Sequence, residues 1–396
     1  MWDGWVTCRL GDLMDRTTDR LGDASEPTIL TCTENHGLVD QIEHMGRRRA
    51  TDDVSSYKVV EPLDVVYNVY LLWLGAIGQN LTGALGVTSP AYEVFRPSPA
   101  IYGPFLGLLL RSPALLDHFN MISIGTVPRR RRAPWQDFLD VTVTIPSLAE
   151  QQCIVDLIGS LDDAIEAAEE SAGALDHAYL ALLERVNNSG FELRRLESAL
   201  SKAKAGGTPS RRVPKNYGGS IPWLKSGEVE NDSIITSSES ITEFALATSS
   251  AWLAPAGATV VAMYGQGDTK GKAGFLLVPV AMNQAVIALV PNEEIIDGRF
   301  LFHVMRSRTV SLRKKAVGAA QPNLSKGIVV DEEIPLPPLG AQAGISSMLD
   351  SALDSRRLAE MHAFSLRNLR TNLLTALLSG THEIPESYDD QLLEAV

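Results

Sequence analysis

Eight residues from Gly265 to Lys272 have the types from which a phosphate-binding loop is built. In that motif two glycines separated by four residues precede a lysine and a serine or threonine, so that backbone N–H groups and the lysine surround phosphate oxygens. Here Gly265 lies one residue too far from Gly271, and Ala273 replaces the hydroxyl residue that would hold magnesium. The spacing therefore favours a tight β-turn over a phosphate site.

Other catalytic patterns are incomplete as well. The stretch from Thr88 to Tyr92 is only superficially like the Asn/Asp-Pro-Pro-Tyr motif of a methyltransferase, and the seven histidines have no paired spacing for a metal. Cys8, Cys32 and Cys153 are scattered, which is typical of free thiols in a reducing compartment. With no signal peptide pattern and no long apolar run, we expect a cytoplasmic protein with no catalytic residue, metal site or cofactor of its own.

Basic residues form short clusters although the formal net charge is −13. Acidic residues outnumber basic ones most strongly within residues 146–190, so the excess negative charge is local. The basic clusters could therefore contact phosphates even in an acidic protein. They are Arg47 to Arg49, Arg129 to Arg132, Lys202 with Lys204, Arg211 with Arg212, Lys270 with Lys272, and Arg313 to Lys315.

The elements that must position these residues occur twice. Pro146 heads one helical run and Pro337 heads another, and Arg111 and Arg306 each precede a serine at nearly the same separation. A repeat of half a chain is too long for a solenoid, so we predict two tandem modules. The predicted boundaries are 1–145 and 191–335 for two recognition domains, 146–190 and 336–380 for two spacer helices, and 381–396 for an acidic tail.

The first spacer helix has apolar residues at alternating steps of four and three, which is the spacing of a coiled coil. The second has a rougher stripe and ends at Gly380. We predict that the two pack antiparallel and place the domains at opposite ends of a rod of about 57 Å. The periodicity alone also fits a generic dimerisation coil. The predicted contact residues are Ile154, Ile158, Leu161, Ile165, Leu175, Leu182, Ile345, Leu349, Leu353, Leu366, Leu373 and Leu377.

Each globular part is rich in short β-like runs interrupted by glycine and proline, such as Tyr57 to Val60 and Ala258 to Ala262. A helix follows the strands in each, from Pro104 to about Asn120 and from Arg299 to about Lys315. We therefore predict α/β domains, each with a twisted and mainly antiparallel sheet.

Taken together, these features resemble the DNA specificity (S) subunit of type I restriction-modification systems. The resemblance covers nearly the whole chain. It rests on the pattern Ile-Pro-x-Leu-x-x-Gln, which occurs twice and which the second copy matches only in part. It also rests on short sequence segments that occur in the same order as in members of the family. These are Tyr57 to Val60, Leu63 to Asn68, Trp73 to Gly78, Ser89 to Tyr92, Gly206 to Ser210, Ile221 to Leu224, Tyr264 to Gly267, and Asn283 to Ala285.

The resemblance implies a non-catalytic subunit that reads a split DNA target and assembles with two methyltransferase subunits and with restriction subunits. S-adenosylmethionine and ATP would then bind to those partners. Alternatives are a self-contained methyltransferase or nuclease with degenerate motifs, and an interaction scaffold that uses its coil without reading DNA. The residues expected to contact DNA are Gln79, Asn80, Arg129, Arg130, Arg131, Arg132, Lys225, Gln266, Lys270, Lys272, Gln321, Asn323 and Lys326.

Overall fold

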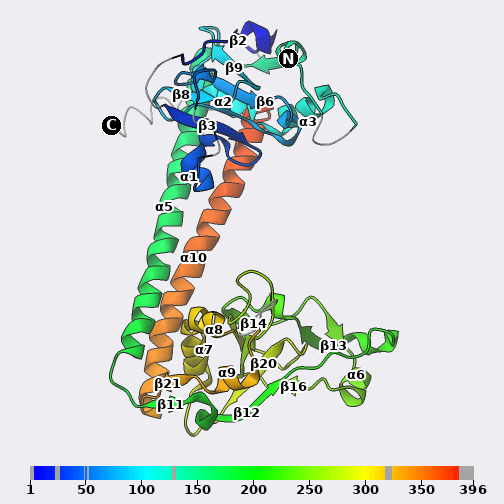
Figure 1. Ribbon diagram of the computed structural model, residues 1–396, viewed down its shortest axis with the longest axis vertical. Coiled ribbons are helices and arrows are strands. Elements are labelled where there is room, and N and C mark those ends of the chain that lie inside the picture. The colour runs from blue at the N-terminus through cyan, green and yellow to red at the C-terminus, as the bar shows by residue number, and fades with distance from the viewer. Residues whose placement is uncertain are drawn as a thin grey trace. The chain divides into compact units, whose positions relative to one another are not determined.

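The computed structural model describes residues 4–22, 27–48, 50, 53–126, 131–316 and 323–382. The chain divides into two compact units (Figure 1). Unit 1 is Met1–Ala167 with His362–Val396, and unit 2 is Ala168–Met361. Both long helices, α5 (Leu148–Asn187) and α10 (Leu339–Leu378), contribute one part to each unit. The boundary between units therefore lies within the helices and not at the predicted ends of the globular parts.

Unit 1 contains two four-stranded sheets and a separate strand pair in its described part. One sheet has the order β2 (Met14–Thr17), β9 (Tyr92–Pro97), β6 (Val65–Asn68), β7 (Ile77–Gln79), and every neighbour in it is antiparallel. The other has the order β4 (Gly37–Asp40), β3 (Thr28–Thr33), β8 (Gly86–Thr88), β5 (Lys58–Val60), in which only β3 and β8 are parallel. The pair joins β1 (Val6–Arg9) to β10 (Thr142–Ile145), directly before α5.

Short helices cover the first sheet of unit 1 and close its core. Tyr67, Phe95, Phe119 and Phe138 are fully buried, and their rings lie 4.8–5.8 Å apart between centroids. Such offset aromatic contacts add to the burial of apolar area that stabilises the core. These helices are η1 (Leu10–Asp12), η2 (Leu72–Leu74), α2 (Gly103–Leu110), α3 (Pro113–Ile122) and α4 (Trp135–Leu139). A further helix, α1 (Gln41–Met45), lies against β3 and β4 of the other sheet.

Unit 2 repeats this plan with one additional strand. Its larger sheet has the order β12 (Leu200–Ala205), β20 (Val286–Pro291), β17 (Thr259–Ala262), β18 (Ala273–Leu276), β14 (Asp232–Ile234). Its smaller sheet has the order β15 (Ser240–Ile241), β13 (Tyr217–Leu224), β19 (Val280–Met282), β16 (Leu253–Ala254). A separate pair joins β11 (Leu193–Arg195) to β21 (Glu333–Pro335), and β21 lies directly before α10. In the same way β10, the partner of β1, lies directly before α5. Among the described strands of unit 2, parallel pairing is confined to β13 with β19 and β14 with β18.

The helices of unit 2 also follow the order seen in unit 1. The described ones are η4 (Leu196–Ala199), η5 (Pro214–Asn216), η6 (Ser226–Glu228), α6 (Glu243–Thr248), α7 (Gly298–Ser307), α8 (Thr309–Lys315) and α9 (Lys326–Val330). Two helices predicted as single runs are each broken into two. Pro113 begins α3, and a proline disfavours helical backbone at the residue before it. In unit 2, Arg308 lies between α7 and α8.

Within each unit, the start of one long helix packs beside the end of the other. In unit 1, Ile154 and Ile158 of α5 share a core with Leu374 and Leu377 of α10. In unit 2, Tyr179 and Leu183 of α5 share a core with Leu349 and Leu353 of α10. Each of the predicted contact residues is buried or half-buried, and α10 ends two residues before Gly380, whose φ is 61°. The predicted fold class, with an antiparallel helix pair joining two α/β domains, is confirmed.

Candidate nucleic-acid interface

Several lysine and arginine side chains of unit 2 lie over the faces of aromatic rings. Lys202 and Lys204 project from β12 over the ring of Trp252, with Nζ 4.3 and 5.4 Å from its centroid. Lys215 lies 3.6 Å from the centroid of Phe244. A ring face attracts a cation and limits its rotamers, so these charges are oriented before any ligand arrives.

Arg211 is the most constrained of these cations. Its guanidinium lies 4.2 Å from the centroid of Tyr217 and 5.2 Å from that of Trp223, and it forms a paired contact with Glu239. The hydrogen bond from Arg211 lowers the pKa of Glu239 to about 2. Lys225, a predicted DNA contact, pairs with the same carboxylate at 3.2 Å. A phosphate that binds either cation must therefore compete with Glu239.

The ring of Trp223 lies under the guanidinium of Arg211. Its side chain is 2% exposed and its indole Nε1 donates to the carbonyl of Gly207 at 3.0 Å. Trp223 is therefore a core residue. Gly207 is required there, since a Cβ at this position would lie 2.4 Å from Ser250 Oγ.

The segment resembling a phosphate loop joins two antiparallel strands, β17 and β18, and opens no helix. Gly271 has a φ of 81°, and a Cβ there would lie 2.6 Å from the carbonyl oxygen of Thr309. Arg313 donates to the carbonyl oxygens of Lys270 and Asp268, which fixes the loop against α8. The segment connects two strands, as a turn would, but residues 263–272 form a loop that is longer than the predicted tight β-turn.

The same loop carries three predicted DNA contacts. Gln266 is exposed near its tip, Lys270 is half-buried, and Lys272 pairs with Glu230 at 2.5 Å and Asp268 at 3.1 Å. These two carboxylates raise the pKa of Lys272. In this conformation Gln266 is therefore more accessible to a ligand than Lys272. Nearby, Lys326 is exposed at the first residue of α9 and Asn323 is half-buried.

In unit 1 the structure places Gln79 and Asn80 inside the fold. They are 6% and 2% exposed, and their amide nitrogens donate to the backbone carbonyls of Leu63, Gly103, Val60, Glu61 and Ala84. Buried amides of this kind support the backbone, because leaving a buried carbonyl without a donor costs free energy. The expectation that these two side chains face a DNA groove is not compatible with these positions.

Of the four arginines predicted to contact DNA in unit 1, Arg131 and Arg132 belong to the described residues, whereas Arg129 and Arg130 lie outside them. Gln321 of unit 2 also lies outside the described residues. Arg131 donates to Asn120 Oδ1 at 2.7 Å and to the carbonyl of Ser123 at 3.0 Å, and stacks on Trp73 at 5.0 Å. It therefore compensates the free carbonyls at the end of α3. Arg132 is exposed.

Sequence reasoning did not select Lys202, Lys204, Arg211 or Lys215 as individual contacts. Arg211 and Tyr217 are close in sequence, so a search for cations near aromatic residues could have found that pair. The pairing of Lys202 with Trp252 depends on the sheet and has no local sequence signal. Within the described residues there is no group of three or more potential metal-ligating side chains, and no described helix is long and apolar enough to cross a membrane.

Comparison with known proteins relates this chain to a family. Residues 188–360, most of unit 2, match the family described as the type I restriction modification DNA specificity domain. Over 155 residues the chain is 27% identical to the EcoR124I/EcoR124II specificity subunit of Escherichia coli, covering 38% of each chain. Over 158 residues it is 24% identical to the MjaIX specificity subunit of Methanocaldococcus jannaschii, covering 38% of this chain and 35% of that one. The alignments thus span little more than a third of these relatives.

Solved structures extend the likeness of fold to both units. A chain from a study of complex assembly and conformational transition in the type I restriction-modification system matches with a TM-score of 0.60 at 16% identity, covering 96% of this chain and 98% of that chain. The S subunit from M. genitalium matches with a TM-score of 0.57 at 11% identity, covering 94% and 96%. The predicted resemblance to type I S subunits is confirmed: residues 188–360 match the model of the type I restriction modification DNA specificity domain, and the fold of both units is that of S subunits.

Proposed function

We propose that this protein is the DNA-recognition subunit of a type I restriction-modification complex and is not itself a catalyst. The family match of residues 188–360 is the observation that carries the proposal. In unit 2, DNA would meet the cations arranged on aromatic rings, with Lys202 and Lys204 on phosphates and Gln266 near base edges. Glu239 would limit non-specific attraction by neutralising Arg211 and Lys225 until a phosphate replaces it.

We further propose that the target is split into two parts. Units 1 and 2 share the strand order of their sheets, apart from the additional strand β14 in unit 2, but differ in their surface residues, so each would suit a different half-site. Helix α5 has 40 residues, or about 60 Å at 1.5 Å per residue, and would set the gap between the half-sites.

Methyltransferase subunits would dock on the long helices. Several apolar side chains of α10 are more than half exposed in the isolated chain, and exposed apolar groups of this size are typical of surfaces that a partner covers. They are Leu358 (67%), Met361 (65%), Phe364 (62%) and Leu369 (51%). Restriction subunits would join the resulting complex, and S-adenosylmethionine and ATP would bind to the partners.

The test uses the chain assembled with the methyltransferase subunits of its own host. Sequencing of methylated adenines should give a motif with two short boxes and an unread gap. Replacing Lys202 and Lys204 by glutamate should weaken DNA binding at least tenfold and make it less dependent on salt, because two phosphate contacts are lost. The control Arg185→Glu reverses an exposed charge on α5. Stoichiometric methylation by the isolated chain would contradict the proposal.

A further inference from the structure

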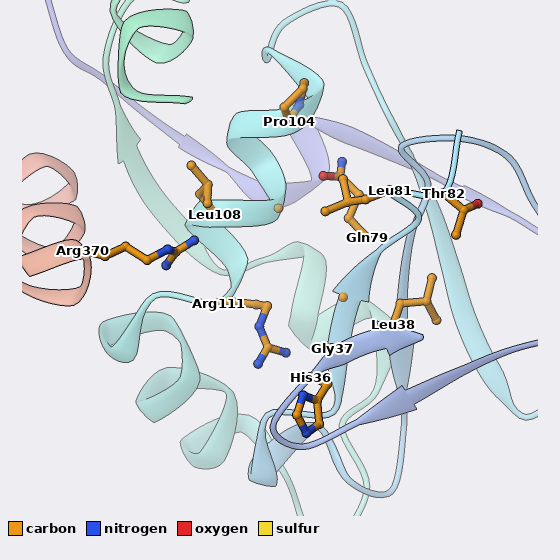
Figure 2. Close-up of a pocket in the computed structure, with 12 residues that line it drawn as sticks. His36, Gly37, Leu38, Gln79, Leu81, Thr82, Pro104, Leu108, Arg111 and Arg370 are labelled. Atoms are coloured by element: carbon orange, nitrogen blue, oxygen red, sulfur yellow. The ribbon is translucent and has the colours of Figure 1, made fainter. Parts of the chain in front are cut away.

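Unit 1 contains a pocket of about 440 Å³ between α2, the end of β7, the turn before β4, and α10 (Figure 2). Leu38, Leu81 and Leu108 form apolar parts of its wall. Arg111 from the end of α2 and Arg370 from α10 bring two guanidinium groups to it, and His36 lies at its edge. Small-molecule sites commonly have volumes of about 300–1,000 Å³ and mix apolar walls with a few polar groups.

The corresponding place in unit 2 can be identified because α2 and α7 align in their buried residues. Phe105 and Leu106 of α2 are fully buried, as are Phe300 and Leu301 of α7. The same separation of 195 relates Leu108 to His303 and Arg111 to Arg306. On the long helices the separation is 191, and it relates buried Ile158 of α5 to buried Leu349 of α10. The same separation relates Gly159 of α5 to Asp350 of α10, and Tyr179 of α5 to Arg370 of α10.

In unit 2 this place is filled by the protein itself. His303 Nε2 lies 2.9 Å from Asp350 Oδ1, and its Nδ1 lies 2.9 Å from the hydroxyl of Tyr179. Arg299 also pairs with Asp350, through Nε at 3.0 Å and through a second contact. The carboxylate of Asp350 thus joins α10 to α7, and a second carboxylate, that of Asp176 on α5, pairs with Arg306 at 3.7 Å.

In unit 1 neither the carboxylate of Asp350 nor the imidazole of His303 has an equivalent, and Arg370 pairs with Asp162 of α5. Gly159 stands where unit 2 has Asp350, and Leu108 stands where it has His303. Gly107 replaces Phe302, and a side chain at Gly107 would meet Gln79 Oε1 at 2.4 Å, so the ring of Phe302 has no equivalent. The substitutions remove a carboxylate, an imidazole and a phenyl ring from one place, which accounts for the space.

Arg111 has no carboxylate partner among the described residues. Its guanidinium donates to the carbonyl oxygens of Ile77 at 2.7 Å, Asn35 at 3.1 Å and Gly75 at 3.4 Å. Burial lowers its pKa but leaves the group charged at neutral pH, because an arginine is effectively always protonated. Arg370 pairs with Asp162. The pocket therefore has an excess of positive charge in a partly enclosed, partly apolar setting, where an anion is bound more strongly than in water.

We propose that this pocket binds a small organic anion whose carboxylate or phosphate group contacts Arg111 and Arg370. The apolar walls would contact the body of the ligand. The site is independent of the DNA-recognition function proposed above, and binding would rigidify the junction of α2 with α10 in unit 1 as Asp350 does that of α7 in unit 2.

The test is calorimetric titration of the full chain at constant ionic strength with phenyl phosphate, phenylacetate, inorganic phosphate and neutral benzyl alcohol. We expect saturable binding of phenyl phosphate or phenylacetate with a dissociation constant in the millimolar range or tighter, at least tenfold tighter than that of benzyl alcohol. The two aromatic anions distinguish a phosphate from a carboxylate ligand, and inorganic phosphate tests the contribution of the apolar walls.

The decisive variant is Gly159→Asp, which adds a second carboxylate to α5 one turn before Asp162, the partner of Arg370. A Cβ at Gly159 meets nothing within 4 Å, so the substitution has room. It should weaken anion binding at least tenfold while the melting temperature of the ligand-free protein stays the same or rises. Gly173→Asp is the matched control, because this glycine of α5 lies in unit 2 and also has open space around its Cβ. Absence of saturable anion binding, or equal binding by Gly159→Asp and Gly173→Asp, would overturn the proposal.

Discussion

The side-chain oxygen of Gln342 accepts a hydrogen bond of 2.7 Å from the backbone N–H of Asp297. The same arrangement occurs in the other unit, where Gln151 accepts from the N–H of Tyr102 at 2.8 Å. Each glutamine also donates to the carbonyl of the proline that precedes its helix, Pro337 or Pro146, at 2.9 Å. Both glutamines are at least 99% buried. The glutamine of the repeated sequence pattern therefore ties the start of each long helix to the segment that enters α2 or α7.

Replacing Gln342 by alanine should destabilise the protein by about 2–4 kcal/mol. The change removes three hydrogen bonds and leaves the N–H of Asp297 and the carbonyl of Ile295 buried without their partner. Urea denaturation followed by circular dichroism measures the loss. Gln152→Ala is the control, because Gln152 is exposed on α5. A loss below about 0.5 kcal/mol for Gln342→Ala would show that this glutamine has no such structural role.

Stability should fall as the pH is lowered from about 6.5 to about 4 because of His303. Burial lowers the pKa of His303 to about 4, from 6.5 for an ordinary histidine. Between these values the unfolded chain binds a proton that the folded protein does not, so the contribution of His303 is fully present above pH 6.5 and is lost on acidification. The difference of pKa corresponds to roughly 3 kcal/mol at most.

The measurement compares the free energy of unfolding of the native protein with that of His303→Gln between pH 7 and pH 4. Glutamine stays neutral and can hydrogen-bond to Tyr179 and Asp350. The carboxyl groups titrate in both proteins, so their effect largely cancels in the difference. We expect the native protein to lose stability more steeply than the variant in this window. Parallel curves would rule out a depressed pKa of His303.

Exchanging residues 191–335 for the corresponding part of a related specificity subunit should change one half-site of the DNA target only. The exchanged segment contains both sheets of unit 2 and none of the described strands of unit 1. Methylation sequencing of cells carrying the hybrid gives both half-sites at once. If both half-sites changed, the two units would have to read DNA jointly.

Lengthening both long helices should widen the gap between half-sites. Four residues inserted after Ala167 in α5 and four after Met361 in α10 add about 6 Å to each helix, or somewhat less than two base pairs. Both insertions lie at the boundary between the units, so the packing inside each unit is kept. The methylated motif should retain both boxes and gain one or two base pairs of gap.

The control for this experiment is the insertion in α5 alone. Four residues nearly preserve helical phase but shift the apolar stripe of one helix past the other, so assembly with the methyltransferase should weaken. An unchanged gap in an active complex with both insertions would mean that the long helices do not set the spacing.

The repeat, the long helices and the class of fold could all be predicted from the amino-acid sequence. These features depend on local patterns: the alternating steps of apolar residues in α5, the proline and glutamine at the head of each helix, and Gly380 past the end of α10. A buried stripe on one helix face leaves a periodic trace in the sequence because 3.6 residues make a turn. The breaks before Pro113 and at Arg308 were missed, since the apolar pattern continues across both.

Which polar residues are available to a ligand could not be predicted from the sequence, because it depends on how distant segments pack. Gln79 and Asn80 have the same donors and acceptors as amides that read bases, yet both are buried on backbone carbonyls. Lys225 and Lys272 are cations in sequence, but carboxylates distant along the chain lie beside them. The difference between Gly159 and Asp350 acquires meaning only when α2 and α7 are placed against the long helices. Charge and hydrogen-bonding type are properties of a residue, whereas burial and pairing depend on contacts between segments far apart in sequence.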